Sequence, residues 1–484
     1  MTQTLSTRHG RLVLLLLCAV AFLDFVDASI VNVALPAMRQ DLHFSVQELQ
    51  WVPSGYLLTY GGFMLLGGRV ADLLGRRRVL VAGTVVIAVS SLLGGLVQDA
   101  GLLVAARLAQ GTGAAMMLPA ALSILTTTFR DASDRHAALG VWGAVGGLAS
   151  AVGVLLGGVL TEGPGWRWVL FVNPIAAALV IPAAYGLLPD DRRRARMAEV
   201  DIPGSLLVTG AMLVLVFSLV RAPDHGWTAS ETVFGLAGAA ALLVGFWVNE
   251  RRARNPLIPL GFLRTPGIAA ASVTGLTAFA GLLAMFFFLT LYLQTVLHYS
   301  PLKTGLAYLP LTFGVGVAAG VASKLMAKVG TRPLVVSGAV IGSAGLFMLS
   351  RIPVNGSYVT DLLPGLMVVS LGLGAVFVAV TTAANAGVAA KDAGLAAALL
   401  NASQQVGSAL GLAIFSAAAT ARTTGLLRQH VSPASAATSG FQRALLLGCA
   451  FLAAAAVVGL RVSQAHGEEH LDDHAHDEVL VATS

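Results

Sequence analysis

Three charged residues stand inside long apolar stretches of the chain. Asp24 and Asp27 fall in the stretch that begins at Leu12, and Arg107 falls in a later one. A charged side chain at the centre of a bilayer costs at least about 2.5 kcal/mol on insertion scales, so such a residue usually serves a function. The i, i+3 spacing of the two acids places them on one face of a helix. We expect that face to meet other helices or a water-filled cavity.

The rise of a helix predicts that the three charges share one depth in the membrane. At about 1.5 Å per residue, Asp24 lies roughly 20 Å and Asp27 roughly 24 Å from the inner end of the first span. The span that carries Arg107 enters the membrane from the other side. Arg107 therefore lies roughly 21 Å above the same inner surface in a core of ~30 Å. We expect Arg107 to pair with one acid, while the other protonates more easily and carries protons. A static ion pair that only fixes helix packing is the alternative.

The composition excludes a soluble protein. Of the 484 residues, 56% are hydrophobic and 11% are charged, and the mean hydropathy is +0.80, whereas soluble proteins are roughly 25% charged. Stretches long enough to cross a bilayer predict fourteen transmembrane helices. They lie at 11–35, 52–70, 79–98, 101–128, 137–160, 168–188, 204–221, 232–249, 268–294, 304–324, 333–350, 362–386, 395–418 and 440–461.

Most lysines and arginines fall between spans on the side of the N-terminus. This distribution predicts that both termini are cytoplasmic. It also accounts for the net charge of +6, so the positive charge does not indicate a nucleic-acid partner.

The segment GRVADLLGRRR, between the second and third spans, combines residues suited to a gate. Gly68 and Gly75 permit close approach and a sharp turn, and Asp72 can pair with a basic residue or face a helix N-terminus. Arg76 and Arg77 are expected to hold the loop at the cytoplasmic surface. We expect this contact to break when two halves of the protein move; a simple topology anchor is the alternative.

A weaker copy of this segment, SKLMAKVGTRP, follows the tenth span. Gly330 and Arg332 stand there at the positions of Gly75 and Arg77. The repeat indicates two related halves, a plan in which transporters bind substrate between the halves near the midplane.

Further residues are expected to pack helices or to contact substrate. Gly153 and Gly157, with Gly158 beside them, form a seam of small residues for close helix contact. Gln110, one turn after Arg107, is expected to orient it or to meet substrate. Helix packing is the alternative for the aromatic candidates, and interhelical hydrogen bonding for the polar ones. The other substrate candidates are Phe25, Asn32, Tyr292, Asn401, Gln404 and Gln405.

The chain resembles the major facilitator superfamily and, within it, the fourteen-helix drug:proton antiporters. The resemblance rests on three motifs, which are the segment from Gly68, DASIVNVALP from Asp27 and RLAQG from Arg107. The glycines from Gly153 match a fifth-helix antiporter motif, except that Val154 replaces its usual proline. WRWVLFVNP, which enters the sixth span, is also similar.

The resemblance implies a fold class, an all-α membrane protein with two six-helix bundles plus two extra transmembrane helices. In that fold Asp27 and Arg107 would relay protons and Asp72 would gate. The expected domains are an N-terminal bundle at 1–188, a linker with the two extra helices at 189–265, a C-terminal bundle at 266–461 and a disordered, acidic, histidine-containing cytoplasmic tail at 462–484.

The resemblance further implies proton-driven efflux of hydrophobic, in some cases cationic, drugs or secondary metabolites across the cytoplasmic membrane. Val154 keeps open the alternative of a proton-coupled importer of a small metabolite. An intramembrane aspartyl protease does not fit, because its two acids come from facing helices and Asp24 and Asp27 share one. We expect no enzyme activity, cofactor or metal, and a monomer whose partners are a small-molecule substrate, protons and the lipid bilayer.

Overall fold

The computed structural model describes residues 5–465 except 130, 191–200, 254–255, 258–261, 263–266, 387 and 389–392. In this part of the chain almost every residue is helical and none forms a strand. Fourteen of its helices are long and apolar enough to cross a membrane, which confirms the predicted fold class. The elements are α1 (Arg8–Asp41), α2 (Val46–Leu49), α3 (Trp51–Leu74), α4 (Arg76–Leu96), α5 (Ala100–Thr128), α6 (Ala132–Glu162), α7 (Arg167–Leu187), α8 (Ile202–His225), α9 (Ser230–Arg252), α10 (Ile268–Leu291), the π-helix η3 (Tyr292–Val296), α11 (Pro301–Val329), α12 (Thr331–Leu349), the π-helix η4 (Tyr358–Leu362), α13 (Leu363–Asn385), α14 (Ala393–Arg428) and α15 (Pro433–Gly459).

Several helices continue past the predicted spans. The predicted thirteenth span stops at 418, whereas α14 runs to Arg428. Hydropathy marks where apolar sequence ends, but a helix stops where the backbone changes direction. Here the change comes at His430, whose φ is 60°, and at Ser432, whose side chain caps α15.

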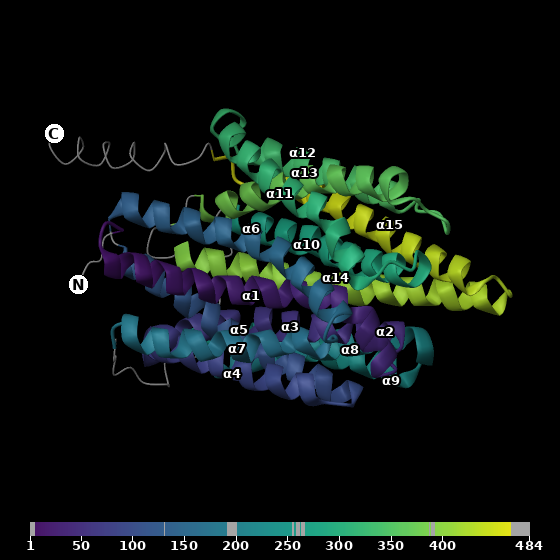
Figure 1. Ribbon diagram of the computed structural model, residues 1–484, viewed down its shortest axis with the longest axis horizontal. Helices are drawn as coiled ribbons and strands as arrows, with labels where there is room; N and C mark the ends of the chain where they lie inside the picture. The colour runs from purple at the N-terminus through teal and green to yellow at the C-terminus, as the bar shows by residue number, and fades with distance from the viewer. Residues whose placement is uncertain are drawn as a thin grey trace.

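The helices lie side by side along the long axis of the molecule, and α1 begins at the end where α15 finishes (Figure 1). We call this the terminus end, and the other the opposite end. One six-helix bundle consists of α1 and α3–α7, and the second of α10–α15. The pair α8 and α9 packs together, and α8 contacts both α3 and α14. The two extra helices therefore cover one side of the boundary between the bundles.

Buried apolar side chains join the bundles at the opposite end. One core cluster there combines Ile30 and Met38 of α1 with Phe287 and Phe288 of α10. Near the terminus end, the second bundle has a cluster drawn from α10–α15 and Val462 alone. Helix α14 adds a second contact near mid-length, where Gln405 packs against Gly61 of α3.

The pair α6 and α11 shows the same asymmetry. At the opposite end, Gly305 packs against the carbonyl of Val154, and Gly158 packs against Leu302. Gly147 lies roughly two turns before Val154, and Gly316 roughly three turns after Gly305, on the same helix faces. Among the described residues, no atom outside the glycine's own stretch of helix lies within 4 Å of where a Cβ would stand on Gly147 or Gly316. The two faces therefore diverge toward the terminus end.

The repeated glycine segments adopt related conformations. Gly75 joins α3 to α4 with a φ of 100°, and Gly330 joins α11 to α12 with a φ of 80°. Both values are in the region that favours glycine. Arg77 donates to the Leu188 carbonyl just after α7, at 2.9 Å. Arg332 donates to the Val462 carbonyl just after α15, at 3.1 Å, so each half binds the end of its own sixth helix in this way.

The start of the predicted disordered tail is ordered. Val462 is fully buried, Ser463 accepts from the Thr331 hydroxyl at 2.6 Å, and the Ala465 carbonyl accepts from the Thr331 amide at 2.9 Å. Backbone hydrogen bonds can fix a polar segment that hydropathy does not mark. The rest of the predicted tail, 466–484, lies outside the described residues.

Candidate functional site

Helix α1 carries the two acids into different surroundings. Asp27 and Asp24 are both buried, with 2% and 4% of their surface exposed. Asp27 pairs with Arg107 of α5, whose Nη1 lies 2.9 Å from Oδ2. Its other oxygen accepts from the Asn173 amide of α7 at 2.5 Å. The expected ion pair therefore forms, and Asp27 is the acid that takes part.

A closed ring of hydrogen bonds surrounds this pair. Arg107 donates to Gln110 Oε1 at 2.6 Å, and the Gln110 amide donates to the Ser91 hydroxyl oxygen of α4. That oxygen also accepts from Asn173 at 2.9 Å, and Asn173 returns to Asp27. The ring ties α1, α4, α5 and α7 together. Gln110 orients Arg107 here, which is one of its two predicted roles.

Asp24 has only neutral partners. The Tyr56 hydroxyl donates to Oδ1 at 3.0 Å, and the Tyr60 hydroxyl donates to Oδ2 at 3.1 Å. The two rings come from successive turns of α3 and meet edge to face at 5.6 Å. Within the described part of the chain, no cation forms an ion pair with Asp24. A carboxylate held in this way can gain a proton without breaking an ion pair.

Tyr56 connects the two acids. Its hydroxyl contacts Asp24, while its ring lies 4.5 Å from the Arg107 guanidinium carbon. Arg107 also donates from Nε to the Val52 carbonyl at 3.0 Å. Tyr56 therefore contacts both Asp24 and the cation that pairs with Asp27.

The predicted gate residues hold one bundle together. Asp72 accepts from Arg76 at 3.0 Å, and Arg76 also reaches Thr127 of α5 at 2.9 Å. Arg77 contacts the end of α7, as described above, and Gly68 lies beside Pro119 of α5. Among the described residues, these contacts stay within the first bundle. Asp72 thus pairs with a basic residue, as predicted, and its role as a gate stays a prediction.

The predicted substrate residues have different neighbours. Tyr292 is fully buried and donates to the Pro353 carbonyl at 2.5 Å, so it packs the second bundle. Gln405 packs against Gly61 of α3, whereas Gln404 packs against Gly275 of α10. These two candidates therefore lie on different faces of α14, and Asn401 is exposed.

The two remaining substrate candidates lie on α1. Phe25 packs against Gly146 of α6. Asn32 donates to the Ala28 carbonyl at 3.0 Å, and its buried side-chain oxygen has no partner among the described residues. Asn32 therefore retains an acceptor for a further contact.

The predicted packing glycines are in close contact with neighbouring helices. Gly153 meets Ser29, and Gly157 meets the Ile30 carbonyl, both on α1. Gly158 faces the second bundle instead. The small residues of α6 therefore permit close contact with α1 on one side and with α11 on the other.

Sequence reasoning missed four members of the site. Tyr56 and Tyr60 stand one turn apart in the second span, and this spacing could have drawn attention to them. Asn173 belongs to the WRWVLFVNP segment that is similar to a family motif. Ser91 carried no signal, because a serine inside an apolar helix commonly bonds to its own backbone.

Comparisons with known proteins agree with this architecture. Residues 17–412 match the family described as the Major Facilitator Superfamily. The chain is 39% identical over 447 residues to the puromycin resistance protein pur8 of Streptomyces alboniger, a match that covers 90% of this chain and 87% of that protein. It is 37% identical over 428 residues to the cephamycin export protein CmcT of Amycolatopsis lactamdurans, with 87% and 88% covered.

Solved structures share the fold at low sequence identity. A bacterial homologue of the human lysosomal transporter Spinster, in an inward-facing and occupied conformation, matches with a TM-score of 0.64 at 18% identity. That match covers 94% of this chain and 97% of the other. The nucleoside transporter NupG matches with a TM-score of 0.63 at 12% identity, with 93% and 99% covered.

Proposed function

The chain belongs to the major facilitator superfamily, and on this premise we propose that it exports hydrophobic antibiotics or related secondary metabolites in exchange for protons. Its relatives include a protein named for puromycin resistance and one named for cephamycin export, which supports outward transport of a small molecule. The chain is a multi-pass membrane transporter, and we place it in the cytoplasmic membrane.

The terminus end of the molecule faces the cytoplasm in this proposal. Arg76, Arg77, Lys328 and Arg332 lie at that end, and basic residues favour the cytoplasmic side. The diverging faces of α6 and α11 then open inward, where substrate enters. The joined opposite end then faces the outside of the cell.

The proposed coupling between proton and substrate rests on the different partners of the two acids. Asp27 stays in the ring with Arg107 and keeps α1, α4, α5 and α7 in register. Asp24 alternates between a proton and the substrate, because its neutral tyrosine partners leave its charge uncompensated. If the transported compound is a cation, the acid attracts both ligands, and their competition couples the two fluxes. Inward movement of one proton supplies roughly 2.3 kcal/mol per 100 mV.

Reconstituted liposomes test this division of roles. With an acidic lumen and a lipophilic dye cation outside, the proton gradient drives dye uptake by an antiporter that runs in reverse. We expect uptake by the wild type and by Glu231→Gln, an exposed acid on α9. Asp24→Asn should abolish gradient-dependent uptake. Unchanged uptake by Asp24→Asn would refute the role of that acid.

The direction of the gradient separates export from the importer alternative. Dye uptake that needs an acidic exterior would indicate a proton-coupled importer. Val154 raised that alternative, but it is 2% exposed and sits in the closed seam between α6 and α11. Valine therefore occupies the usual proline position without opening the seam, and the export reading is the one we adopt.

A further inference from the structure

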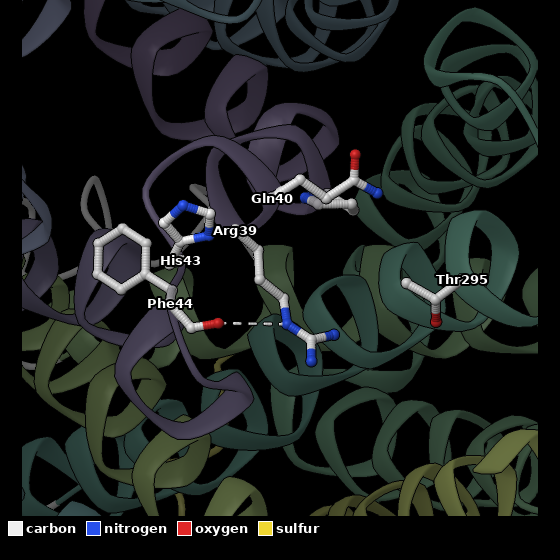
Figure 2. Close-up of a pocket in the computed structure, with 6 residues that line it drawn as sticks. Arg39, Gln40, His43, Phe44 and Thr295 are labelled. Carbon is white, nitrogen blue, oxygen red and sulfur yellow. Dashed lines mark hydrogen bonds between the residues drawn. The ribbon is translucent and has the colours of Figure 1, made fainter. Parts of the chain in front are cut away.

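A second polar site lies at the opposite end of the molecule, far along α1 from Asp24. A hollow of about 340 Å³ opens there (Figure 2). Five of its lining residues belong to the end of α1 and the turn that follows; these are Pro36, Arg39, Gln40, His43 and Phe44. The sixth is Thr295 of η3. Because α1 and η3 belong to different bundles, the hollow lies across the boundary that is closed in this conformation.

Arg39 is a half-buried cation to which the described part of the chain offers no acid partner. Its Nε donates to the Phe44 carbonyl at 3.4 Å, a long bond that leaves both terminal nitrogens available. Figure 2 shows these nitrogens extending past the carbonyl on the side where Thr295 is drawn. Among the described residues, no carboxylate lies within ion-pair distance of Arg39. Removing a charge from water without such a partner is costly.

The neighbouring acids are already engaged. The Asp41 carboxylate accepts from Arg167 and from the Trp166 indole. The Glu48 carboxylate accepts from the Ser45 amide at 3.1 Å, as part of a capping box. The positive charge of Arg39 is therefore not neutralised by the acids around it, and a planar guanidinium binds carboxylate or phosphate oxygens well.

Irregular backbone builds the two walls of the hollow. His43 has a φ of 57°, which turns the chain so that the Phe44 carbonyl comes back to Arg39. On the other wall, η3 is a π-helical turn, a feature often found at functional sites. The Thr295 hydroxyl donates to the Leu291 carbonyl at 2.6 Å, so its oxygen can still accept a hydrogen bond. Gln40 adds an exposed amide that can donate.

We propose that this hollow binds a small anion that carries a carboxylate or phosphate group. Arg39 is its cationic anchor, and the Gln40 amide is a neutral donor beside it. An anion seated between α1 and η3 contacts both bundles, so it stabilises the conformation in which this end is closed. The anionic group belongs either to a free ion on that side of the membrane or to an exported compound that is leaving.

Thermal unfolding of the purified protein tests the site. Sodium phosphate is compared with sodium chloride at equal ionic strength, in the wild type, Arg39→Gln and Arg443→Gln. Arg443 is an exposed arginine at the same end but outside the hollow, so it controls for loss of one positive charge. We expect phosphate to raise the unfolding temperature of the wild type and of Arg443→Gln. Arg39→Gln should need about tenfold more phosphate for half of that shift.

Two results would overturn the proposal. One is an absent phosphate effect in the wild type, and the other is an equal effect in Arg39→Gln. If Arg39→Gln does not fold, Arg39→Lys replaces it. A lysine keeps the charge but not the planar fork, so the effect should persist at severalfold higher phosphate. A loss of the effect in Arg443→Gln equal to that in Arg39→Gln would also contradict a site in the hollow.

Liposome transport separates the two sources of the anion. If the source is a free ion, external phosphate should slow dye transport severalfold in the wild type and not in Arg39→Gln. If the source is the exported compound, Arg39→Gln should slow a carboxylate-bearing substrate without slowing a dye cation. If neither variant nor phosphate changes transport, the proposed link between the site and closure is wrong.

Discussion

The pair of Asp27 and Arg107 offers a direct test of the proposed division between the two acids. Arg107 is 1% exposed and Asp27 is 2% exposed, with their charged atoms 2.9 Å apart. Removing one member of such a buried pair leaves the other uncompensated and costs about 3–5 kcal/mol. We therefore expect Asp27→Asn and Arg107→Gln each to lower the free energy of unfolding by about that amount.

The double variant gives the sharper result. With Asp27→Asn and Arg107→Gln together, no buried charge remains in the ring, and amide groups can still exchange hydrogen bonds. We expect a loss of about 2 kcal/mol, well below the sum of the single losses, because the two residues interact directly. Reversible unfolding in mixed micelles, followed by circular dichroism, measures all three values.

Asp24→Asn provides the matched control on the same helix. This change removes a charge that no cation balances, and the asparagine can keep a hydrogen bond to one tyrosine. The free energy of unfolding of Asp24→Asn should therefore fall by no more than about 1 kcal/mol. The reasoning fails if Asp27→Asn costs no more than Asp24→Asn, or if the losses of the two single variants simply add.

Three further predictions follow from other contacts. Tyr56→Phe and Tyr60→Phe each remove one hydrogen-bond donor to Asp24, a bond worth about 1.5–3 kcal/mol. We expect each variant to reduce liposome dye uptake severalfold. Wild-type uptake in both variants would contradict the role of the tyrosines. A Cβ on Gly305 would lie 2.6 Å from the Val154 carbonyl, so Gly305→Leu should separate the bundles at the opposite end. Gln294 of η3 donates to the Val33 carbonyl of α1 across this boundary at 2.9 Å. Labelling of Gln294→Cys by an impermeant thiol reagent should therefore increase, measured with the chain's two cysteines replaced by Cys18→Ser and Cys449→Ser. Gly316→Leu, in the open part of the same helix, should not increase it. A chain that ends after Ala465 should unfold like the wild type. One that ends after Arg461 should lose about 2 kcal/mol of unfolding free energy, because its hydrogen bonds to Thr331 and Arg332 are gone. Equal stability of the two chains would show that this docking is weak.

That Asp27 and Arg107 lie level with each other could be predicted because α1 and α5 run as helices through both residues. A constant rise per residue fixes how far each charge lies from the end of its helix. The choice of partner could not be predicted in the same way. It depends on how α1 is rotated in the bundle, which turns Asp24 toward α3 and Asp27 toward α5 and α7. The packing of neighbouring helices sets that rotation, and one sequence does not reveal it.

Polar side chains on α14 show a second limit. Gln404 and Gln405 are both candidates for substrate contact, but consecutive residues on a helix point about 100° apart. They meet α10 and α3 on different sides. In the gate segment, Arg76 reaches Thr127 of α5 and Arg77 reaches the end of α7, and neither partner could be named from the sequence. Residue type and spacing identified these groups, whereas their partners follow from the tertiary arrangement.

The divergence of α6 from α11 suggests how such a transporter could be inhibited. Alternating access requires these two helices to close at the end where they are now apart. Gly143 and Gly147 on α6, and Gly316 and Gly320 on α11, present faces without side chains there. A rigid, wedge-shaped molecule that fills this space would block closure without competing for Asp24. Such an inhibitor would also obstruct the path by which substrate enters, and resistance to it would arise through bulkier residues at these glycines.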